Sequence, residues 1–351
     1  MPESSGRSTR SPRPLAALGA LGAAAAAVGA ARVLQDARLH AVSTELTGAV
    51  ALVAGGSRGL GLAICEELAG RGLRVVACAR DAEELTRAAD QLRAHGHELH
   101  TRVCDVSDPT GVAELVADVE RRLGPVEVLV SVAGIITVGL VESLTLQDFE
   151  ANMAVTFWGG FHLSQAVLPG MRERGRGHIA TIASIGGRIA PPHLLPYAAA
   201  KFASVGYHEG LRAELTGTGV QVTTVFPGLM RTGSHAAAQF SGDKSAEYSW
   251  FATAASLPGL AMDARRAAAR IVRAILLGRP EVQLPLYTHL ATRVHGLAPA
   301  TTTRFLGLVN ALLPGAEGGP GWLRYRRSGW LQRLTAPGQR AARQLNQRGA
   351  A

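Results

Sequence analysis

The stretch that decides the fold spans residues 49–61 and reads AVALVAGGSRGLG. Its first six residues are apolar and predict a buried strand, and a helical pattern follows the glycines as far as Arg71. Glycines at a strand-to-helix turn let the backbone approach a pyrophosphate, while the helix N-terminus offers free N–H groups and the positive end of its dipole. The pattern therefore favours a dinucleotide-binding loop over a merely flexible one. The residues expected to contact the cofactor here are Gly55, Ser57, Arg58, Gly59, Leu60 and Gly61.

The chain up to residue 286 alternates short β-branched or apolar runs with longer helical stretches, which is typical of βαβ units and a parallel sheet. The sequence thus predicts an α/β fold of the Rossmann type, a doubly wound parallel seven-stranded sheet within a domain spanning residues 47–286. Residues 228–259 are expected to be irregular, before a last helix that Asp263 caps and that runs to Leu277. The strands are expected near residues 49–54, 73–79, 98–103, 126–131, 177–183, 220–226 and 281–285.

The residue after the second predicted strand indicates which dinucleotide is preferred. Enzymes that use NAD commonly place a carboxylate there for the ribose 2′-hydroxyl, whereas the 2′-phosphate of NADP needs a cation. Here Arg80 follows the strand, and Arg58 lies inside the glycine loop. Two arginines that converge on one phosphate favour NADP(H), the alternative being that Arg80 only ends its strand in solvent. Asp81 is expected to cap the next helix.

Tyr197 and Lys201 are four residues apart in the segment YAAAK, a spacing that puts both side chains on one face of a helix. A phenol with an ordinary pKa of about 10 is a poor acid or base at neutral pH, but a nearby ammonium favours the phenolate. The pair is therefore expected to exchange a proton with a substrate oxygen. Ser184 ends a predicted strand shortly before Tyr197, and its hydroxyl is expected to hold the same oxygen.

Together these residues resemble the signature of the short-chain dehydrogenase/reductase family, which combines a TGxxxGxG loop, a serine and a YxxxK pair. The resemblance covers residues 46–286, and the segment LPGM at 168–171 is similar to the family's fourth helix. It implies hydride transfer between NADP(H) and a carbonyl or alcohol carbon, with Ser184, Tyr197 and Lys201 as catalytic residues. It also implies dimers or tetramers formed through the fourth and fifth helices. By the same resemblance, further cofactor contacts are expected at Asp105, Val106, Ala133, Gly134, Tyr197, Lys201, Pro227, Gly228 and Thr232.

Several positions depart from the family pattern. Ala54 stands at the position of the loop threonine, and SVAG at 131–134 replaces NNAG, so the hydrogen bonds that steady the central strands must differ. Thr156 falls where the family has its catalytic asparagine, which supports a water-bridged proton relay to the lysine, partly through its backbone carbonyl. Asn152 lies one helical turn earlier, and we expect it to be a surface or packing residue, with a compensating role in the relay as the alternative.

Other reactive side chains are expected to be structural. His193 and His208 flank the tyrosine helix, but the chemistry needs neither, and a histidine outside any ligand or triad spacing is more often packed or solvated than catalytic. Cys65, Cys78 and Cys104 lack metal-ligand or redox spacing and are expected to be buried and reduced. No metal site is expected.

Both ends of the chain are basic, whereas its body is neutral. The formal net charge is +9, and residues 320–351 hold seven arginines and no acid, while residues 1–14 hold three arginines and one glutamate. Residues 15–31 are uncharged and rich in Ala, Gly and Leu, near the lower limit of about 17 residues for a bilayer span. Segment 1–46 is expected to be either a membrane anchor or interfacial helix, with its arginines on the cytoplasmic side, or a flexible tail. A nucleic-acid partner is not expected, because it would need a basic patch on the folded domain.

The C-terminal extension, residues 287–351, begins with a leucine-rich stretch broken by Pro299 and Pro314. This stretch is expected to be an added helix, a substrate-site cover or a second membrane contact.

The leading expectation is a cytoplasmic-side enzyme that uses NADPH to reduce a small lipophilic ketone or aldehyde, reversibly to alcohol oxidation. Two alternatives remain. One is a dinucleotide-binding scaffold or sensor without turnover, which the altered Ala54, Val132 and Thr156 would explain, and the other is a module whose tails chiefly tether it to a membrane. The lipophilic substrate is suggested by the leucine-rich stretch and by aromatic residues expected to form a lid, namely Phe240, Tyr248, Trp250 and Phe251.

Overall fold

The computed structural model describes residues 13–257, 260–315 and 329–347, and the chain divides into two compact units, residues 1–45 and 46–351. The first unit contains helix α1 (Arg13–Glu45). Within the described ranges, no helix combines the length and the hydropathy that crossing a bilayer requires. The basic tail before α1, with Arg7 and Arg10, lies outside the described residues.

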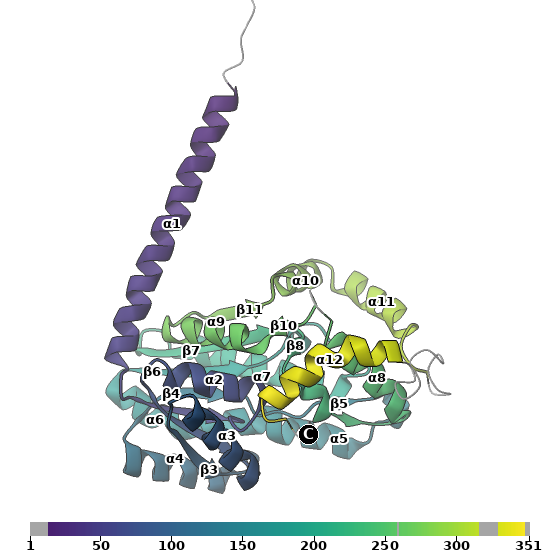
Figure 1. The fold of residues 1–351 in the computed structure, drawn as a ribbon, viewed down its shortest axis with the longest axis horizontal. Coiled ribbons are helices and arrows are strands. Elements are labelled where there is room, and N and C mark those ends of the chain that lie inside the picture. Colours follow the sequence, from purple (N-terminus) through teal and green to yellow (C-terminus); the bar gives the residue numbers. More distant parts are fainter. Residues whose placement is uncertain (1–12, 258–259, 316–328, 348–351) are drawn as a thin grey trace, which may run out of the picture. The chain divides into compact units, whose positions relative to one another are not determined.

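The second unit is built on a sheet of seven parallel strands in the order β11-β7-β6-β4-β1-β2-β3 (Figure 1). This confirms the predicted Rossmann-type sheet. The strand order reverses at β1, because β2 lies on one side of it and β4 on the other, and ligands of open α/β sheets bind beyond the carboxyl ends of the strands at such a point. The strands are β1 (Val50–Ala54), β2 (Arg74–Ala79), β3 (Leu99–Val103), β4 (Val126–Ser131), β6 (Gly177–Ile182), β7 (Val220–Pro227) and β11 (Glu281–Leu284).

Helices cover both faces of the sheet (Figure 1). α2 packs against α9 on one face, and α6 packs against α4 and α7 on the other. The carboxylates of Asp81 and Asp263 accept hydrogen bonds from the backbone of the first turns of α3 and α9, so both predicted caps are confirmed. The helices of this layer arrangement are α2 (Gly59–Ala69), α3 (Ala82–Ala94), α4 (Pro109–Leu123), α6 (Gly159–Arg174), α7 (Leu195–Glu214) and α9 (Ala264–Leu276).

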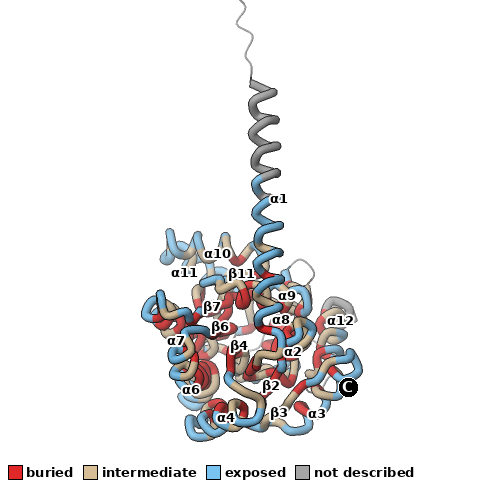
Figure 2. Tube along the Cα trace, turned by 90° about the vertical axis from the view of Figure 1, so that its left-hand side faces the viewer, coloured by how far each residue is buried: buried red, intermediate tan, exposed pale blue. Residues whose placement is uncertain are grey.

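The central strands form the most buried part of the molecule (Figure 2). Every residue of β1 and β4 is buried, because helices lie on both sides of the sheet. This explains why these strands are apolar at nearly every position instead of alternating. The three cysteines are free and buried, as predicted.

The prediction that residues 228–259 are irregular is wrong. Helix α8 (Lys244–Ala254) occupies much of this range, and Asp243 caps it by accepting hydrogen bonds from Ser245 N and Ala246 N. Short elements fill the rest. They are β8 (Met230–Arg231), η4 (Ser234–Ala236) and β9 (Gln239–Phe240), and β10 (Met262–Asp263) follows; β9 pairs with β5 (Thr137–Val138) and β10 with β8.

Among the described residues, the helices that follow the sheet are α10 (Leu286–Leu297), α11 (Pro299–Asn310) and α12 (Gly329–Gln344). Pro299 is the first residue of α11. At this position the N–H that proline lacks would have no partner within the helix, so the proline starts α11 and separates it from α10. Most of α10 and α11 is exposed or half-buried (Figure 2). The large apolar residues of this region that are exposed are Leu286, Leu290, Val294, Leu297, Phe305, Leu308 and Leu312.

Candidate active site

Ser184, Tyr197 and Lys201 meet at the carboxyl end of the sheet. Ser184 follows β6 and caps the short helix η3 (Ile185–Gly187), its Oγ accepting a hydrogen bond from Gly186 N at 2.9 Å. Tyr197 and Lys201 lie one turn apart at the start of α7, and the Lys201 Nζ lies 5.7 Å from the centre of the tyrosine ring. A Cβ built on Gly186 would lie 3.3 Å from Ser184 Oγ and 3.1 Å from the Tyr197 ring, so the two side chains are neighbours.

Burial controls the electrostatics of this group. It raises the pKa of Tyr197 above the ordinary value of a phenol, and a hydrogen bond with Ser184 opposes that rise. It lowers the pKa of Lys201 to about 8, and Lys201 Nζ donates a hydrogen bond to the Ile182 carbonyl at 2.6 Å. The expected lowering of the phenol pKa by the ammonium is therefore outweighed. Tyr197 is a neutral phenol at pH 7, the form that can donate a proton.

Thr156 lies close to the lysine. A Cβ built on Gly134 would be 3.3 Å from Thr156 Oγ1 and 3.6 Å from Lys201 Nζ. Thr156 belongs to a π-helical turn, η2 (Met153–Trp158), and its Oγ1 accepts a long hydrogen bond of 3.4 Å from Ile135 N. The residue that replaces the family asparagine thus faces the site from a local widening of the helix.

Asn152, the alternative for that role, is hydrogen-bonded to other groups. Its Nδ2 donates to Thr137 Oγ1 and to the Asp148 carbonyl, each at 2.8 Å, and the residue is fully buried in α5 (Leu146–Asn152). It is a packing residue, as expected, but not a surface one.

The glycine loop joins β1 to α2 in a tight turn. At Gly61 any Cβ would collide with the carbonyl oxygen of Gly55, so only glycine lets this helix start approach the turn so closely. The Ala54 carbonyl accepts hydrogen bonds from both Val132 N and Ala133 N at 2.9 Å. The backbone alone thus ties β1 to the segment after β4, where the family uses polar side chains.

A buried carboxylate that was not predicted from the sequence accepts hydrogen bonds from the glycine loop. Glu84, on the first turn of α3, accepts hydrogen bonds from Ser57 Oγ and Arg58 Nη1, each at 3.1 Å. Only 2% of Glu84 is exposed. Its one detectable signal is its place three residues after the helix cap Asp81, which points it back toward the loop.

Arg80 directly follows β2, and 61% of its side chain is exposed. Its guanidinium lies 3.8 Å from the carboxylate of Asp105. Burial alone would raise the pKa of Asp105, but hydrogen bonds from Ser107 and the charge of Arg80 bring it below its ordinary value. The two arginines predicted to share one phosphate therefore each lie beside a carboxylate.

The segment after β7 faces the glycine loop. Pro227 ends β7, Gly228 follows, and Thr232 is buried with its Oγ1 accepting a hydrogen bond from Ser234 N. A Cβ built on Gly59 would lie 3.8 Å from the Thr232 Cβ. Two of the other predicted cofactor contacts are core residues here: Leu60 is buried in α2, and Val106 packs against Gly159 at the start of α6.

An apolar wall lies beside Tyr197. Val138, Leu194 and Phe251 form a buried cluster against which Tyr197, Phe240 and Trp250 pack. Here α8 brings aromatic residues to the site, rather than an irregular lid. The same helix carries Glu247, whose carboxylate pairs with His193 Nδ1 at 2.7 Å and accepts a hydrogen bond from Trp250 Nε1 at 2.6 Å.

The other histidine of interest, His208, is structural. Burial lowers its pKa to about 4, and its Nδ1 contacts the Ser204 carbonyl at 2.8 Å. It is neutral at pH 7 and packed inside α7, as expected. In the described part of the chain, no group of three or more acidic, histidine or cysteine side chains is arranged to hold a metal.

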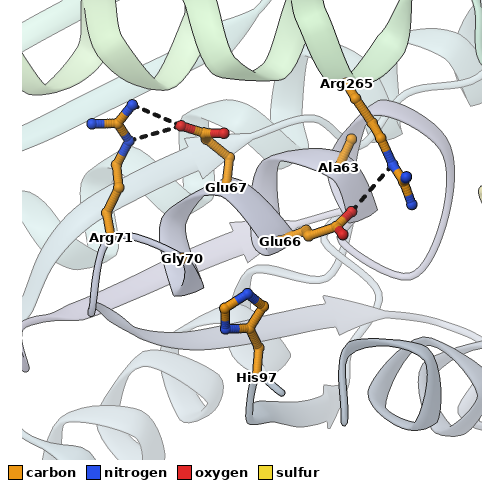
Figure 3. A pocket seen from close by; sticks show the side chains of 7 residues that line it. All are labelled: Ala63, Glu66, Glu67, Gly70, Arg71, His97 and Arg265. Carbon is orange, nitrogen blue, oxygen red and sulfur yellow. Dashed lines mark hydrogen bonds and ion pairs between the residues drawn. The ribbon is translucent and has the colours of Figure 1, made fainter. Parts of the chain in front are cut away.

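A cavity of about 520 Å³ lies away from this chemistry, along α2 (Figure 3). It is at the far end of that helix from the glycine loop, because Gly59 begins α2 and Gly70 follows its last residue. Its charges are paired: Arg71 donates to Glu67, and Arg265 contacts Glu66 at 3.4 Å. It is a charged surface hollow whose lining contains none of the predicted site residues.

Leu345 and Asn346 were not expected at this site, yet they lie on the glycine loop. The backbone carbonyl of Leu345 accepts a hydrogen bond from Gly59 N at 2.8 Å, and Asn346 Nδ2 donates to the Ser57 carbonyl at 2.8 Å. Nothing in the sequence indicates this contact, which joins residues almost 290 positions apart.

Comparison with known proteins places this arrangement in a family. A family model described as short chain dehydrogenase matches residues 49–240. The chain belongs to this family. A Streptomyces coelicolor protein named "Putative ketoacyl reductase" is 42% identical over 189 residues, which cover 52% of this dehydrogenase and 71% of that protein.

Solved structures show the same fold. One, of an actinorhodin polyketide ketoreductase variant with NADPH, has a TM-score of 0.59 and 32% identity, and the match covers 67% of this chain and 95% of that one. Another, of a metagenomic short-chain oxidoreductase in complex with NADP, has a TM-score of 0.55 and 27% identity, and covers 68% of this chain and 97% of that one. This short-chain dehydrogenase is therefore an oxidoreductase of the class that acts on CH–OH and C=O groups.

Proposed function

We propose that this short-chain dehydrogenase reduces a lipophilic ketone or aldehyde with NADPH, and that Tyr197 is the proton donor. The observation that carries the proposal is the grouping of Ser184, Tyr197 and Lys201 at the carboxyl end of the sheet, with Tyr197 held as a neutral phenol. The same residues run the reverse reaction, alcohol oxidation, when the phenol has lost its proton.

The residues at the carboxyl ends of the strands, where the strand order reverses at β1, fit a dinucleotide. The glycine loop would hold the pyrophosphate, Asp105 the adenine end, and Gly134 and Thr232 the nicotinamide side. The close approach that Gly61 permits and the lack of a side chain on Gly134 next to Lys201 support this placement. When bound, NADPH supplies a hydride from C4 of its nicotinamide ring.

The protein's own part in the reaction is to hold an oxygen and give it a proton. The Ser184 hydroxyl donates a hydrogen bond to the substrate carbonyl oxygen and keeps it beside Tyr197 Oη. As the carbonyl π bond breaks and the carbon gains the hydride, the Tyr197 O–H bond breaks and its proton goes to that oxygen, which gives the alcohol. The ammonium of Lys201 stabilises the phenolate that remains.

The preference for NADP(H) over NAD(H) rests on Arg80, which follows β2, and on Arg58 in the glycine loop. Arg80 is exposed and paired with Asp105 only at 3.8 Å, so a 2′-phosphate can approach it. Two of the solved relatives hold NADPH and NADP, which supports the same choice. Turnover measured side by side with NADPH and NADH tests this preference.

The lipophilic nature of the substrate rests on the wall of Leu194, Phe240, Trp250 and Phe251 next to Tyr197. Exposed apolar side chains on α10 and α11 support a membrane surface as a partner, and no Asp or Glu occurs from residue 282 to residue 316. Aromatic residues exposed on η2 and α7, Trp158 and Phe202, support a homo-oligomer formed through that face.

The second candidate is a dinucleotide-binding scaffold or sensor without turnover. Thr156 favours it, because this residue lacks the side-chain amide that the family's asparagine brings to the proton relay, although its backbone carbonyl is kept. Binding of NADPH without turnover across a broad panel of ketones and aldehydes would support this candidate.

The decisive experiment is the variant Tyr197→Phe. We expect NADPH consumption with an accepted carbonyl substrate to fall by at least about 100-fold, because proton donation in the transition state contributes that much or more. Tyr207→Phe is the matched control: this tyrosine is also on α7, but its hydroxyl contacts Gln165. Unchanged turnover in Tyr197→Phe would refute the assignment.

A further inference from the structure

The C-terminal segment, here defined as Gln344–Gln347, lies across the phosphate end of the candidate cofactor site. It begins at the last residue of α12, and this helix packs against α8 and β8. Two residues here are only 3% exposed, Ala342 in α12 and Leu345 in the segment. Both therefore pack against the rest of the domain. The segment contacts the glycine loop, and α12 contacts β8, so together they bridge the two regions between which the cofactor is expected to lie.

The contact with Gly59 occupies a backbone N–H group that a pyrophosphate would use as a hydrogen-bond donor. Gly59 is the first residue of α2, and its N–H is one of the free amides that a helix N-terminus offers to an anion. Here that N–H donates to the Leu345 carbonyl at 2.8 Å. A Cβ built on Gly59 would lie 2.7 Å from Gln347 Nε2, so the close approach that this glycine permits is taken by the segment itself.

Asn346 is the main anchor of the segment. Its Nδ2 donates to the backbone carbonyls of Ser57 and Glu84 at 2.8 and 2.9 Å, and its Oδ1 accepts from Arg87 Nε at 3.0 Å. Its φ of 56° is in the left-handed region, which asparagine tolerates better than most residues. From α3, Gln91 Nε2 adds a hydrogen bond to the Gln344 carbonyl at 2.9 Å.

We propose that the C-terminal segment is a built-in competitor of the cofactor pyrophosphate and that Asn346 sets the cofactor affinity. The inference rests on the proposed function in one respect, that the dinucleotide binds at the glycine loop. The Leu345 carbonyl and a phosphate oxygen both accept hydrogen bonds, so they compete for the Gly59 N–H. Cofactor binding therefore releases the segment, and its apparent affinity is reduced by the fraction of molecules in which the segment is docked.

The variant Asn346→Gly in the full chain tests this competition. It removes the three side-chain hydrogen bonds, while glycine still permits the positive φ. We expect the Kd for NADPH, measured by the change in nicotinamide fluorescence, to decrease by about fivefold to tenfold, because each lost hydrogen bond loosens the competing segment. Arg343→Ala, an exposed position one turn earlier, is the control and should leave the Kd unchanged.

A second variant and a second measurement guard against a merely structural effect. Gln91→Ala weakens docking from the α3 side and should also tighten NADPH binding. Backbone hydrogen exchange of residues 340–347 should become faster when NADP⁺ is added to the unmodified protein. Slower exchange, or an equal Kd in both variants and the unmodified protein, would overturn the competition while leaving the cofactor site intact. Absence of NADPH binding in every protein would overturn the proposed function as well.

Discussion

At the scale of single residues, burial is the main cause of the pKa shifts of both Tyr197 and Lys201. Burial disfavours charge, so it raises the pKa of Tyr197 and lowers that of Lys201 to about 8. The phenol therefore keeps its proton at neutral pH, and the lysine is the group whose charge changes near physiological pH. This combination suits reduction, in which the phenol starts protonated and the ammonium stabilises the phenolate that forms.

The pH dependence of reduction should report the titration of Lys201. Because the pKa is lowered, the ammonium is present below about pH 8 and is lost as the pH rises through that value. We expect kcat/KM for carbonyl reduction to fall about tenfold per pH unit above pH 8. The groups that face Lys201 do not titrate there: the pKa of His208 is about 4, and that of Tyr197 is raised.

The variant Lys201→Arg provides the control for this profile, because a guanidinium stays charged at every pH used. Its activity is expected to be lower at pH 7, since arginine does not fit the position of the ammonium next to Ile182. Its profile should nevertheless lack the fall near pH 8. A fall at the same pH in both proteins would assign the titration to another group.

The sequence predicted the placement of a side chain correctly where its neighbours are close in sequence and missed it where they are distant. The Tyr197–Lys201 pair depends on a helical spacing of four, which the sequence displays, so the structure places the two together. The ion pair of Arg58 with Glu84 depends on how α3 packs against the glycine loop. The only local sign of that contact is the place of Glu84 three residues after the helix cap Asp81.

At the scale of elements, buried parallel strands were the easiest feature to predict, since their apolar runs are continuous. Helix α8 was missed because its sequence, KSAEYSWFATA, has no apolar periodicity of its own. Its aromatic residues pack toward Tyr197, and its start is fixed mainly by Asp243. A tertiary contact thus decides this helix, and tertiary contacts are not visible in a single sequence.

Removing the cap of α8 should therefore affect both stability and catalysis. Asp243→Ala deletes the acceptor for two backbone N–H groups, which costs about 1 kcal/mol of the free energy of unfolding. We expect a lower midpoint in thermal unfolding and a KM for the carbonyl substrate raised several-fold, because α8 carries Trp250 and Phe251. Lys244→Ala, the next residue, is the control. An unchanged KM together with the lower midpoint would show that α8 does not shape the substrate site.

At the scale of the whole molecule, the unusual feature is apolar surface on the helices that follow the sheet. Leu286 and Leu297 are 82% and 89% exposed. α10 also contacts the catalytic side, because Tyr287 Oη accepts a hydrogen bond from Leu229 N, in the loop after β7. An apolar surface next to the substrate loop would bring the mouth of the site to the source of a lipophilic substrate.

This arrangement predicts binding to anionic vesicles through α10 and α11. The full chain should sediment with phosphatidylglycerol vesicles and less with phosphatidylcholine, and added salt should weaken the binding, because arginines are the charges of this region. The double variant Leu290→Gln with Leu308→Gln should reduce the partition coefficient about tenfold, since each leucine loses its apolar burial in the interface.

The control for that experiment is Leu146→Gln, which changes an equally exposed leucine on α5, away from the two helices. It should bind vesicles like the unmodified protein. If the double variant also binds unchanged, α1 or the basic tail carries the interaction and not the helix pair. If it instead turns an oligomer into monomers in light scattering without any vesicle binding, the exposed leucines form a contact between copies of this chain, because a second apolar face can cover them as a bilayer would.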